Sequence, residues 1–514
     1  MYPEHFFHYI NQKIKKEWRF AFCSALCMGL LIHMFRLTNH LLTWDSVYNF
    51  HSDQNVIHLG RCFLTLTCGI GSYYDLQWVN GLLSLIYLSL VSVCLTELFS
   101  LKKKVCIFLM CGITVSFPSV ASTFAYMYTA DGYFLAQLLV TLAVLITLKC
   151  KKGFLPGIFL FALAAGSYQA YISYAVMLIL TWSALQLLWE KLSVRQLLGY
   201  WVRFLLMGSI GIGFYLIANK LLTVLEGASA SDYNGISTMS IPDARGLVLA
   251  AKNCIIDFAY FFFGPLDSMN FYKILNASLI LLLLLLFCHL VWKQKLYQKW
   301  GNLLMALVCL GAMPFACSMI YFLSPSVRYY MLMYAGFSLI YLLPVLFYEN
   351  MNDSEPAVKS GLSPKLLLSW GCIVLTVLTV FNFILISNIS YLYMVTSNEK
   401  TFQLVSRMTD RIEHLEDYPS AKKLCLLGHF EDYDTISLTL PPAMAGIRDS
   451  VLISEQEHFV AMMETYFGLS LENCSEEEQK QIQSSALFAG MDCWPAADSV
   501  VLEGDTVIIK IGEE

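Results

Sequence analysis

Long apolar segments alternate with short polar clusters along most of the chain, up to about Ser397, and acidic residues become common after it. A helix rises 1.5 Å per residue, so about 20 mostly apolar residues are needed to cross the roughly 30 Å hydrocarbon layer of a membrane. About eleven segments meet this requirement. Their approximate centres are Met28, Ile86, Ile113, Val140, Leu160, Ile179, Ile212, Leu282, Leu310, Ile340 and Val380. The pattern therefore predicts an all-α polytopic membrane domain over residues 1–395.

The remaining residues, 396–514, mix helical and strand patterns. Phe402 to Leu415 has the apolar spacing of a helix, whereas Lys423 to Gly428 and Val507 to Ile511 have the composition of strands. A unit of about 115 residues is within the normal size range of a domain. We expect a small soluble α/β domain at this end of the chain.

Lysine and arginine predict the orientation of the chain, because these residues collect in cytoplasmic loops. They cluster at alternate loops, in Lys13 to Arg19, Lys102 to Lys104, Lys149 to Lys152, Lys191 to Arg203, Lys293 to Lys299, and Lys359 with Lys365. The stretch after Arg36 has no small-residue cleavage pattern, so the first apolar segment is predicted to be retained. Eleven crossings from a cytoplasmic N-terminus place the C-terminal domain outside the cytoplasm. The segment around Leu160 is short and bounded by glycines, and without it the alternation would break.

The composition agrees with a chain that lies mostly in lipid, and it argues against several classes of function. The chain is 57% hydrophobic and 14% charged, against roughly 25% charged residues in soluble domains. The net charge of -5 gives no case for nucleic acid. No P-loop, dinucleotide-binding glycine pattern, H-E-x-x-H or paired C-x-x-C occurs, so nothing supports ATP, NAD or a structural zinc. We predict no cofactor and no metal site; acidic clusters could bind a divalent cation, but no ligand spacing requires one.

Most of the 16 cysteines lie in apolar segments, where a cysteine usually serves as a small buried hydrophobe. Cys425, Cys474 and Cys493 lie in the predicted C-terminal domain. If that domain is outside the cell, Cys474 and Cys493 could pair, although three cysteines leave one over and the sequence does not choose between them.

The predicted orientation sends four stretches outward, and they hold most of the charges that lie outside the basic clusters. These stretches are Thr38 to Asp75, Ser122 to Asp131, Leu225 to Met269, and Ser324 to Arg328. Polar chemistry is therefore expected on the outer face.

The first outward loop is about 38 residues long, far longer than a simple connection between two helices requires. It contains Asp45, Asp53 and Arg61, with Trp44 and several tyrosines nearby. An aromatic face packs on a sugar ring, and the planar guanidinium of arginine matches a phosphate. A carboxylate at the membrane surface can act as a general base. The alternative is a solvated loop whose aromatic residues form the usual belt at the lipid headgroups.

Further polar groups lie at the outward ends of predicted spans. Asp131, three residues after Tyr128, is another candidate base; alternatively it is a helix N-terminal acid that faces the positive end of the helix dipole. Tyr168 and Gln169 occupy a tight outward turn and could bind a sugar or join two helices. Arg328 lies on the outer side, against the positive-inside bias, and suits a lipid phosphate or pyrophosphate.

Together these motifs resemble those of the GtrII-type glucosyltransferases of bacteria, over roughly Trp18 to Tyr348. The motifs are Asp45 in a long first loop, Gly60-Arg61, the Tyr-x-x-Asp-Gly-Tyr stretch ending at Tyr133, and Ser167-Tyr168-Gln169. Family members usually carry an aromatic residue directly after the arginine, whereas here Cys62 takes that place and Phe63 follows.

The resemblance implies the fold of the wider type C membrane glycosyltransferases, in the bacterial plasma membrane. Such proteins take a sugar from a polyprenyl-phosphate carrier and deliver it to an acceptor outside the cytoplasm. It implies a donor such as polyprenyl-phosphate-glucose and a surface glycan as acceptor, and we expect inversion at the anomeric carbon. Asp45 would remove the proton of the acceptor, with Asp53 and Asp131 as further catalytic candidates, and Arg61 and Arg328 would bind the donor phosphate. Trp44, Tyr128, Tyr168 and Gln169 would bind the sugar or the acceptor.

Two other functions remain open from the sequence. A transporter or flippase of lipid-linked saccharides should carry ionisable residues deep within its spans and often shows repeated halves. The predicted spans hold few charges near their centres, and no repeat is visible. A polysaccharide polymerase or ligase with a pyrophosphate-linked donor would use the loop arginines equally well.

Overall fold

The computed structural model describes residues 2–227, 243–264, 270–351, 363–430, 441, 444, 446–447, 451–453 and 455–512. The structure is 75% helical and has a small sheet in the C-terminal region. The chain forms two compact units. The first comprises Met1–Thr38, Asp53–Asn388 and Leu440–Met444, and the second comprises Asn39–Ser52, Ile389–Thr439 and Ala445–Glu514.

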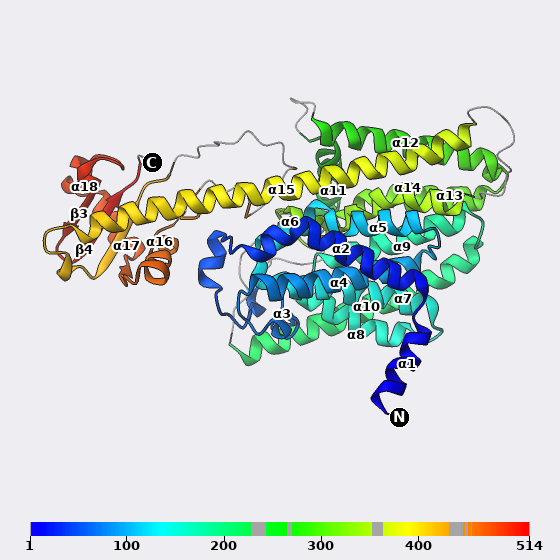
Figure 1. Ribbon diagram of the computed structural model, residues 1–514, viewed down its shortest axis with the longest axis horizontal. Helices are drawn as coiled ribbons and strands as arrows, with labels where there is room; N and C mark the ends of the chain where they lie inside the picture. Colours follow the sequence, from blue (N-terminus) through cyan, green and yellow to red (C-terminus); the bar gives the residue numbers. More distant parts are fainter. Residues whose placement is uncertain are drawn as a thin grey trace. The chain divides into compact units, whose positions relative to one another are not determined.

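The first unit is a bundle of helices (Figure 1). Its α-helices are α1 Pro3–Lys13, α2 Lys16–Thr38, α3 Leu64–Cys68, α4 Gln77–Leu98, α5 Lys104–Ser116, α6 Pro118–Ala125, α7 Met127–Lys149, α8 Phe154–Ser167, α9 Tyr171–Leu188, α10 Val194–Leu225, α11 Ala244–Phe263, α12 Phe271–Lys293, α13 Trp300–Cys317 and α14 Ser338–Asn350. Short 3-10 helices join them, at η2 Ile57–Leu59, η3 Gly69–Gly71, η5 Leu296–Gln298, η6 Met319–Phe322 and η7 Met331–Phe337. Helix α7 packs against α3, α4, α8 and α9.

Within the described residues, eleven helices are long and apolar enough to cross a membrane, which agrees with the predicted number. Two assignments differ from the prediction. The segment around Leu160 forms α8, which has only 14 residues, and α11 lies within the predicted outer loop Leu225 to Met269. Residues 228–242 and 265–269 of that loop, and Lys359 of the last basic cluster, lie outside the described residues.

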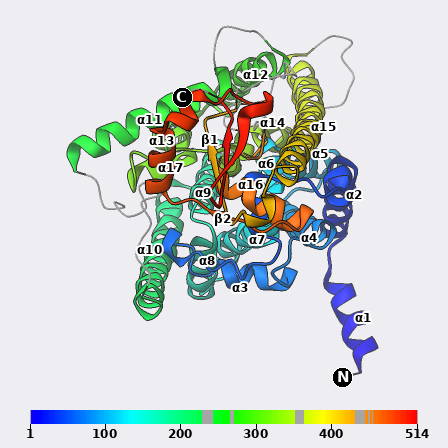
Figure 2. The same ribbon diagram turned by 90° about the vertical axis from the view of Figure 1, so that its left-hand side faces the viewer.

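Helix α11 runs across the bundle. It extends across the view in Figure 2, in which α15, Pro364–Glu413, is seen nearly end-on. Polar contacts on one face hold α11 there. The side chain of Asn253 donates to the Pro325 carbonyl at 3.0 Å, and Asp257 accepts hydrogen bonds from Tyr334 at 2.6 Å and Ser318 at 3.0 Å. These polar residues interrupt the apolar pattern, which is why the sequence predicts a loop here.

The second unit contains a four-stranded sheet in the order β2-β1-β4-β3. Strand β1 is parallel to β2 and to β4, and β3 is antiparallel to β4. Its elements are η1 Trp44–Tyr48, η8 Tyr418–Ser420, β1 Lys423–Leu427, α16 Gln456–Met462, the π-helix η9 Met463–Phe467, β2 Glu472–Asn473, α17 Glu476–Gln483, α18 Ala486–Gly490, η10 Ala497–Ser499, β3 Val500–Glu503 and β4 Thr506–Lys510. Both predicted strands are present, as β1 and β4.

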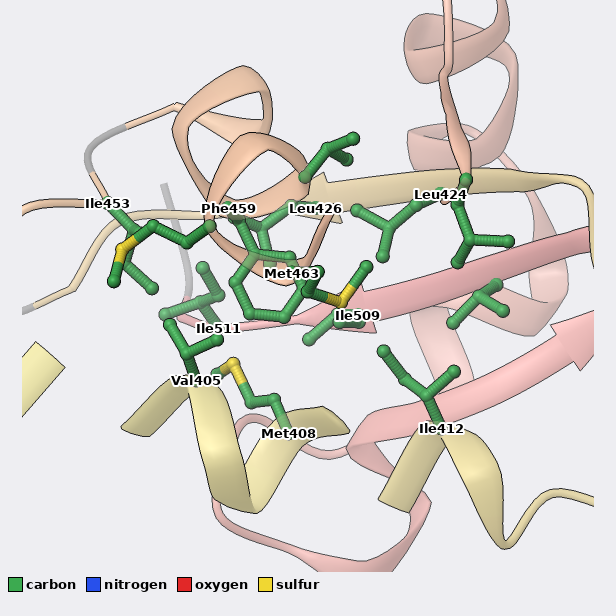
Figure 3. Close-up of a cluster of buried hydrophobic side chains, with 14 of the residues drawn as sticks. Val405, Met408, Ile412, Leu424, Leu426, Ile453, Phe459, Met463, Ile509 and Ile511 are labelled. Atoms are coloured by element: carbon green, nitrogen blue, oxygen red, sulfur yellow. The ribbon is translucent and has the colours of Figure 1, made fainter. Parts of the chain in front are cut away.

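Apolar side chains from α15 and α16 cover one face of this sheet. Figure 3 shows Val405, Met408 and Ile412 of α15 packed toward Leu424 of β1 and Ile509 of β4. All five side chains are buried completely. Helix α15 contributes to both units, because the change from one to the other falls between Asn388 and Ile389. The predicted domain boundary at residue 395 lies in the same helix; whether residues 396–514 form a soluble, extracytoplasmic domain stays a prediction.

Candidate functional site

The loop between α2 and α4 is clamped at Gly60, which ends the short helix η2. Gly60 has a φ of +71°, in the left-handed region that favours glycine. Its carbonyl oxygen accepts hydrogen bonds from Nε2 of Gln169 at 2.8 Å and from the hydroxyl of Tyr215 at 2.8 Å. Gln169 also donates to the Leu59 carbonyl at 3.2 Å. Two side chains from distant parts of the chain therefore fix the backbone directly before Arg61.

Arg61 lies against a pair of stacked tyrosines. Its Nη1 donates to the hydroxyl of Tyr133 at 2.8 Å, and its guanidinium carbon lies 5.7 Å and 5.4 Å from the ring centroids of Tyr133 and Tyr168. The two rings are 4.1 Å apart with an interplanar angle of 15°. Stacking and the hydrogen bond restrict the guanidinium in orientation as well as position. A positively charged, planar group is thus held in a defined place at the end of α7.

The junction of α8 and α9 brings Tyr168 and Gln169 to this loop. Its backbone binds the loop, since Gly166 accepts a hydrogen bond from the Phe63 amide at 2.8 Å. A Cβ on Gly166 would lie 2.4 Å from the Phe63 ring, so a glycine is required for this approach. Tyr168 and Gln169 therefore bind the first loop, rather than only joining two helices.

Asp131 lies in the second turn of α7 and is 1% exposed. Neither carboxylate oxygen has a hydrogen-bond partner among the residues that the structure describes. A Cβ placed on Gly71 would lie 2.6 Å from Oδ2 of Asp131 and 2.9 Å from Oδ1 of Asn80. The side chain therefore faces a buried turn of the first loop and is not at the surface, and its catalytic role stays a prediction.

The other predicted residues of the first unit differ in exposure. Asp53 is exposed and accepts a hydrogen bond from the amide of Asn55 at 3.0 Å. Tyr128 is half-buried, with its ring 6.4 Å from that of Tyr126. Arg328 is exposed, and its guanidinium lies 5.5 Å from the ring centroid of Tyr330.

Asp45 and Trp44 belong to the second unit, although they lie in the first loop of the sequence. Asn398 of α15 holds this segment by donating to the Leu42 carbonyl at 3.0 Å and accepting from the Leu42 amide at 2.8 Å. The ring of Trp44 lies 5.6 Å from that of His458. Asp45 thus belongs to the second unit, whereas Arg61 belongs to the first.

The environment of Asp45 is acidic and partly apolar. Burial raises the pKa of Tyr48, and together with the negative charges of Glu457, Glu455 and Asp45 it brings this pKa to about 12. Burial also lowers the pKa of His458, against the opposing effect of Glu455, Asp45 and Glu457, so this imidazole is largely neutral at pH 7. Within the described parts of both units, no three His, Cys, Asp or Glu side chains gather in a group that could hold a metal ion.

Sequence reasoning alone does not assign roles to Tyr133 and Tyr215. Tyr133 is the last residue of the Tyr-x-x-Asp-Gly-Tyr stretch, so the motif contains it without indicating that it binds Arg61. Tyr215 lies in the apolar helix α10, where nothing in the pattern distinguishes it from a lipid-facing tyrosine.

A family model for the glucosyl transferase GtrII matches residues 34–341. The chain belongs to the GtrII glucosyltransferase family. The match confirms the resemblance seen in the sequence, and it includes Gly60, Arg61, Asp131 and Gln169. No curated protein and no solved structure matches the chain significantly. As a member of this family the chain is a glycosyltransferase, and its eleven long apolar helices indicate a multi-pass membrane protein.

The clamp on Gly60 predicts a large effect of a single methyl group. In Gly60→Ala the new Cβ would lie 2.7 Å from Nε2 of Gln169 and 2.9 Å from the hydroxyl of Tyr215, at a φ that alanine adopts poorly. We expect the loop to shift and sugar transfer to fall about 100-fold, because small misplacements of catalytic groups cause losses of this size. Gly208→Ala on α10 is the matched control, because its Cβ would meet nothing within 4 Å. Equal activity of both variants would show that the clamp does not position the site.

Proposed function

We propose that this protein transfers glucose from a polyprenyl-phosphate carrier to a surface glycan on the outer face of the plasma membrane. The observation that carries the proposal is the guanidinium of Arg61, held between a clamped glycine and two stacked tyrosines in a chain of the GtrII family. Membership of the family supports glucosyl transfer, and the arginine supports a donor that carries a phosphate.

A sugar joined to a lipid phosphate needs no nucleotide at the site of transfer, because the phosphate is already a good leaving group. Negative charge grows on this phosphate as the glycosidic bond breaks. A preorganised cation stabilises that charge in the transition state more than in the ground state, which is how it accelerates the reaction. Arg61 supplies this cation, and the lipid tail lies among the helices with its phosphate at headgroup height.

The acceptor hydroxyl attacks the anomeric carbon directly, with inversion, through a transition state like the oxocarbenium ion of glycosidases. A base removes the proton of the hydroxyl as the new bond forms. Asp45 is our candidate for this base. Its place in the first loop and the motif it matches in the family support the assignment. In this reaction the C–O bond to the phosphate breaks, the new C–O bond forms, and the phosphate leaves as an anion.

The exposed guanidinium of Arg328 and its predicted outer position support a role in donor binding. Replacing Arg328 with alanine should raise the apparent KM for the lipid-linked donor about tenfold and leave the KM for the acceptor unchanged. The size corresponds to one charge-assisted hydrogen bond at a partly solvated site. Arg245→Ala removes the same charge from another exposed residue and serves as control. An unchanged donor KM in Arg328→Ala would remove this residue from the donor site.

The donor class is tested with purified protein in liposomes that contain either polyprenyl-phosphate-glucose or polyprenyl-pyrophosphate-glucose. A glucosyltransferase of the proposed type uses the first donor and releases polyprenyl phosphate. A polymerase or ligase uses the second. A flippase moves the labelled lipid between leaflets but transfers no glucose. Transfer from UDP-glucose without any lipid carrier would contradict the proposed donor.

A further inference from the structure

Two cysteines of the second unit lie on neighbouring strands of its sheet. Cys425 is in β1, and Cys474 directly follows β2. Both are buried, with exposed fractions of 0% and 4%. The structure thus places Cys474 near Cys425, a choice that the sequence leaves open among the three cysteines of this unit. Cys493 is half-exposed and lies outside the apolar cluster that contains the other two.

The strand register places the two residues opposite each other. In the parallel pair β1 and β2, Lys423 is opposite Glu472 and Leu424 is opposite Asn473. The amide of Cys474 donates to the Leu424 carbonyl at 3.0 Å, which is the last hydrogen bond of this pair. In the same register the next two residues, Cys425 and Cys474, are opposite each other. Adjacent strands are about 4.8 Å apart, which lies within the Cα separations of roughly 4.4–6.8 Å that a disulfide spans.

Both side chains also point to the same face of the sheet. Leu424 and Leu426 belong to the apolar cluster that α15 and α16 cover, whereas Cys425 and Leu427 belong to a second cluster, on the opposite side of β1. Cys474 is a member of that second cluster as well, and both cysteines are free thiols in the structure. The two side chains therefore lie in the same apolar cluster, on the same side of β1.

We propose that Cys425 and Cys474 form a disulfide bond that fastens β2 to the centre of the sheet. In this step each thiol loses one proton and one electron and the S–S bond forms. The two electrons and two protons pass by thiol–disulfide exchange to a protein dithiol oxidant, whose own disulfide is reduced. The proposal rests on the proposed extracytoplasmic position of this unit, because disulfides persist in oxidising compartments.

The bond would act where the sheet is weakest. Strand β2 has only two residues and pairs with β1 at two positions, and it leads directly into α17. A covalent link at this edge closes a loop of roughly 50 residues, which restricts the unfolded chain considerably. The unit gains stability that its short edge strand does not provide.

Burial also predicts when the bond forms. It raises the pKa of Cys425 to about 12 and raises the pKa of Cys474, so both thiols are protonated in the folded unit. Only the thiolate attacks a disulfide. The exchange therefore takes place during folding, before β2 packs on the sheet, and the completed bond resists reductants in the native protein.

The test is a peptide map of the full-length protein, purified from membranes after free thiols are blocked with N-ethylmaleimide in denaturant. We expect a peptide pair joined through Cys425 and Cys474 that disappears on reduction. Cys425→Ser and Cys474→Ser should abolish it, whereas Cys493→Ser should leave it unchanged and keep the melting temperature of the wild type. The map of the wild type decides the question even if a buried serine variant fails to fold.

Two results would overturn the proposal. One is wild-type protein in which both cysteines carry N-ethylmaleimide, and the other is a bond between Cys474 and Cys493. A membrane-impermeant maleimide applied to intact cells separates failure of the disulfide from failure of the orientation. If a cysteine introduced at the exposed Glu477 is labelled from outside while Cys425 and Cys474 are both alkylated, the disulfide is rejected and the orientation is kept. If the introduced cysteine is not labelled from outside, the extracytoplasmic position is rejected, and the disulfide proposal is rejected with it.

Discussion

Replacing Arg61 with alanine should lower kcat/KM for glucose transfer about 100- to 1000-fold, the usual loss when one preorganised group that stabilises transition-state charge is removed. The guanidinium carries a full positive charge, whereas the tyrosines and the glutamine of the clamped cluster carry none. Its loss should affect the chemical step most, because the phosphate gains charge as the glycosidic bond breaks. Initial rates with polyprenyl-phosphate-glucose in liposomes measure this directly.

Two further variants separate charge from geometry at this position. Arg61→Lys keeps the positive charge but loses the planar fork and the stacking on Tyr168, so it should recover only a small part of the activity. Tyr133→Phe removes the 2.8 Å hydrogen bond and keeps the stacked ring, and a loss of about tenfold is expected. If Arg61→Ala folds as the wild type and retains more than half of its kcat/KM, Arg61 does not stabilise the leaving group.

Replacing Asp45 with asparagine should lower kcat about 100- to 10,000-fold, because general base catalysis contributes a factor of this size. The melting temperature should stay nearly unchanged. Asparagine has the same shape as aspartate but cannot accept the proton of the acceptor hydroxyl. Transfer rates of the wild type and of Asp45→Asn at saturating donor and acceptor provide the measurement.

The two other candidate carboxylates serve as controls. Asp53 is exposed, so Asp53→Asn should keep nearly full activity. Asp131 is buried without a hydrogen-bond partner among the described residues, so Asp131→Asn should leave stability unchanged or raise it, because it removes a buried charge. Full activity of Asp45→Asn, together with loss of activity in Asp131→Asn, would transfer the role of base to Asp131.

Hydrophobic length predicts the membrane helices well, because a crossing requires about 20 apolar residues regardless of its neighbours. The prediction is wrong where the structure of a segment depends on its contacts or on its exact length. Helix α11 carries Asn253 and Asp257, which read as loop residues until their partners Pro325 and Tyr334 are known. Helix α8 is apolar but has only 14 residues, whereas the prediction counts this segment as a full membrane span.

The candidate site is predictable in part for a similar reason. Arg61, Tyr168 and Gln169 are found because they lie in family motifs at helix ends. The contact between Leu42 and Asn398 joins residues that are 356 positions apart, so the packing of the Asp45 segment with the C-terminal part of α15 leaves no local pattern. Tyr215 escapes detection because its role depends on one hydroxyl group in an otherwise apolar helix.

The C-terminal unit shows the same limit at its cysteines. Strands β1 and β4 follow from their apolar composition, which in β4 is also β-branched, whereas β2 has only two exposed residues and no strand signal of its own. Without β2 the register that brings Cys474 to Cys425 cannot be derived, so the sequence leaves the pairing of the three cysteines open.

Transfer of a hexose to the cell surface is tested most directly by mass spectrometry of surface glycans from cells that express the wild type, cells that lack the protein, and cells that express Arg61→Ala. Glycans of the wild-type cells should carry one additional hexose per repeating unit, and this hexose should be missing from both other strains. Identical glycan masses in all three strains would contradict the proposed function.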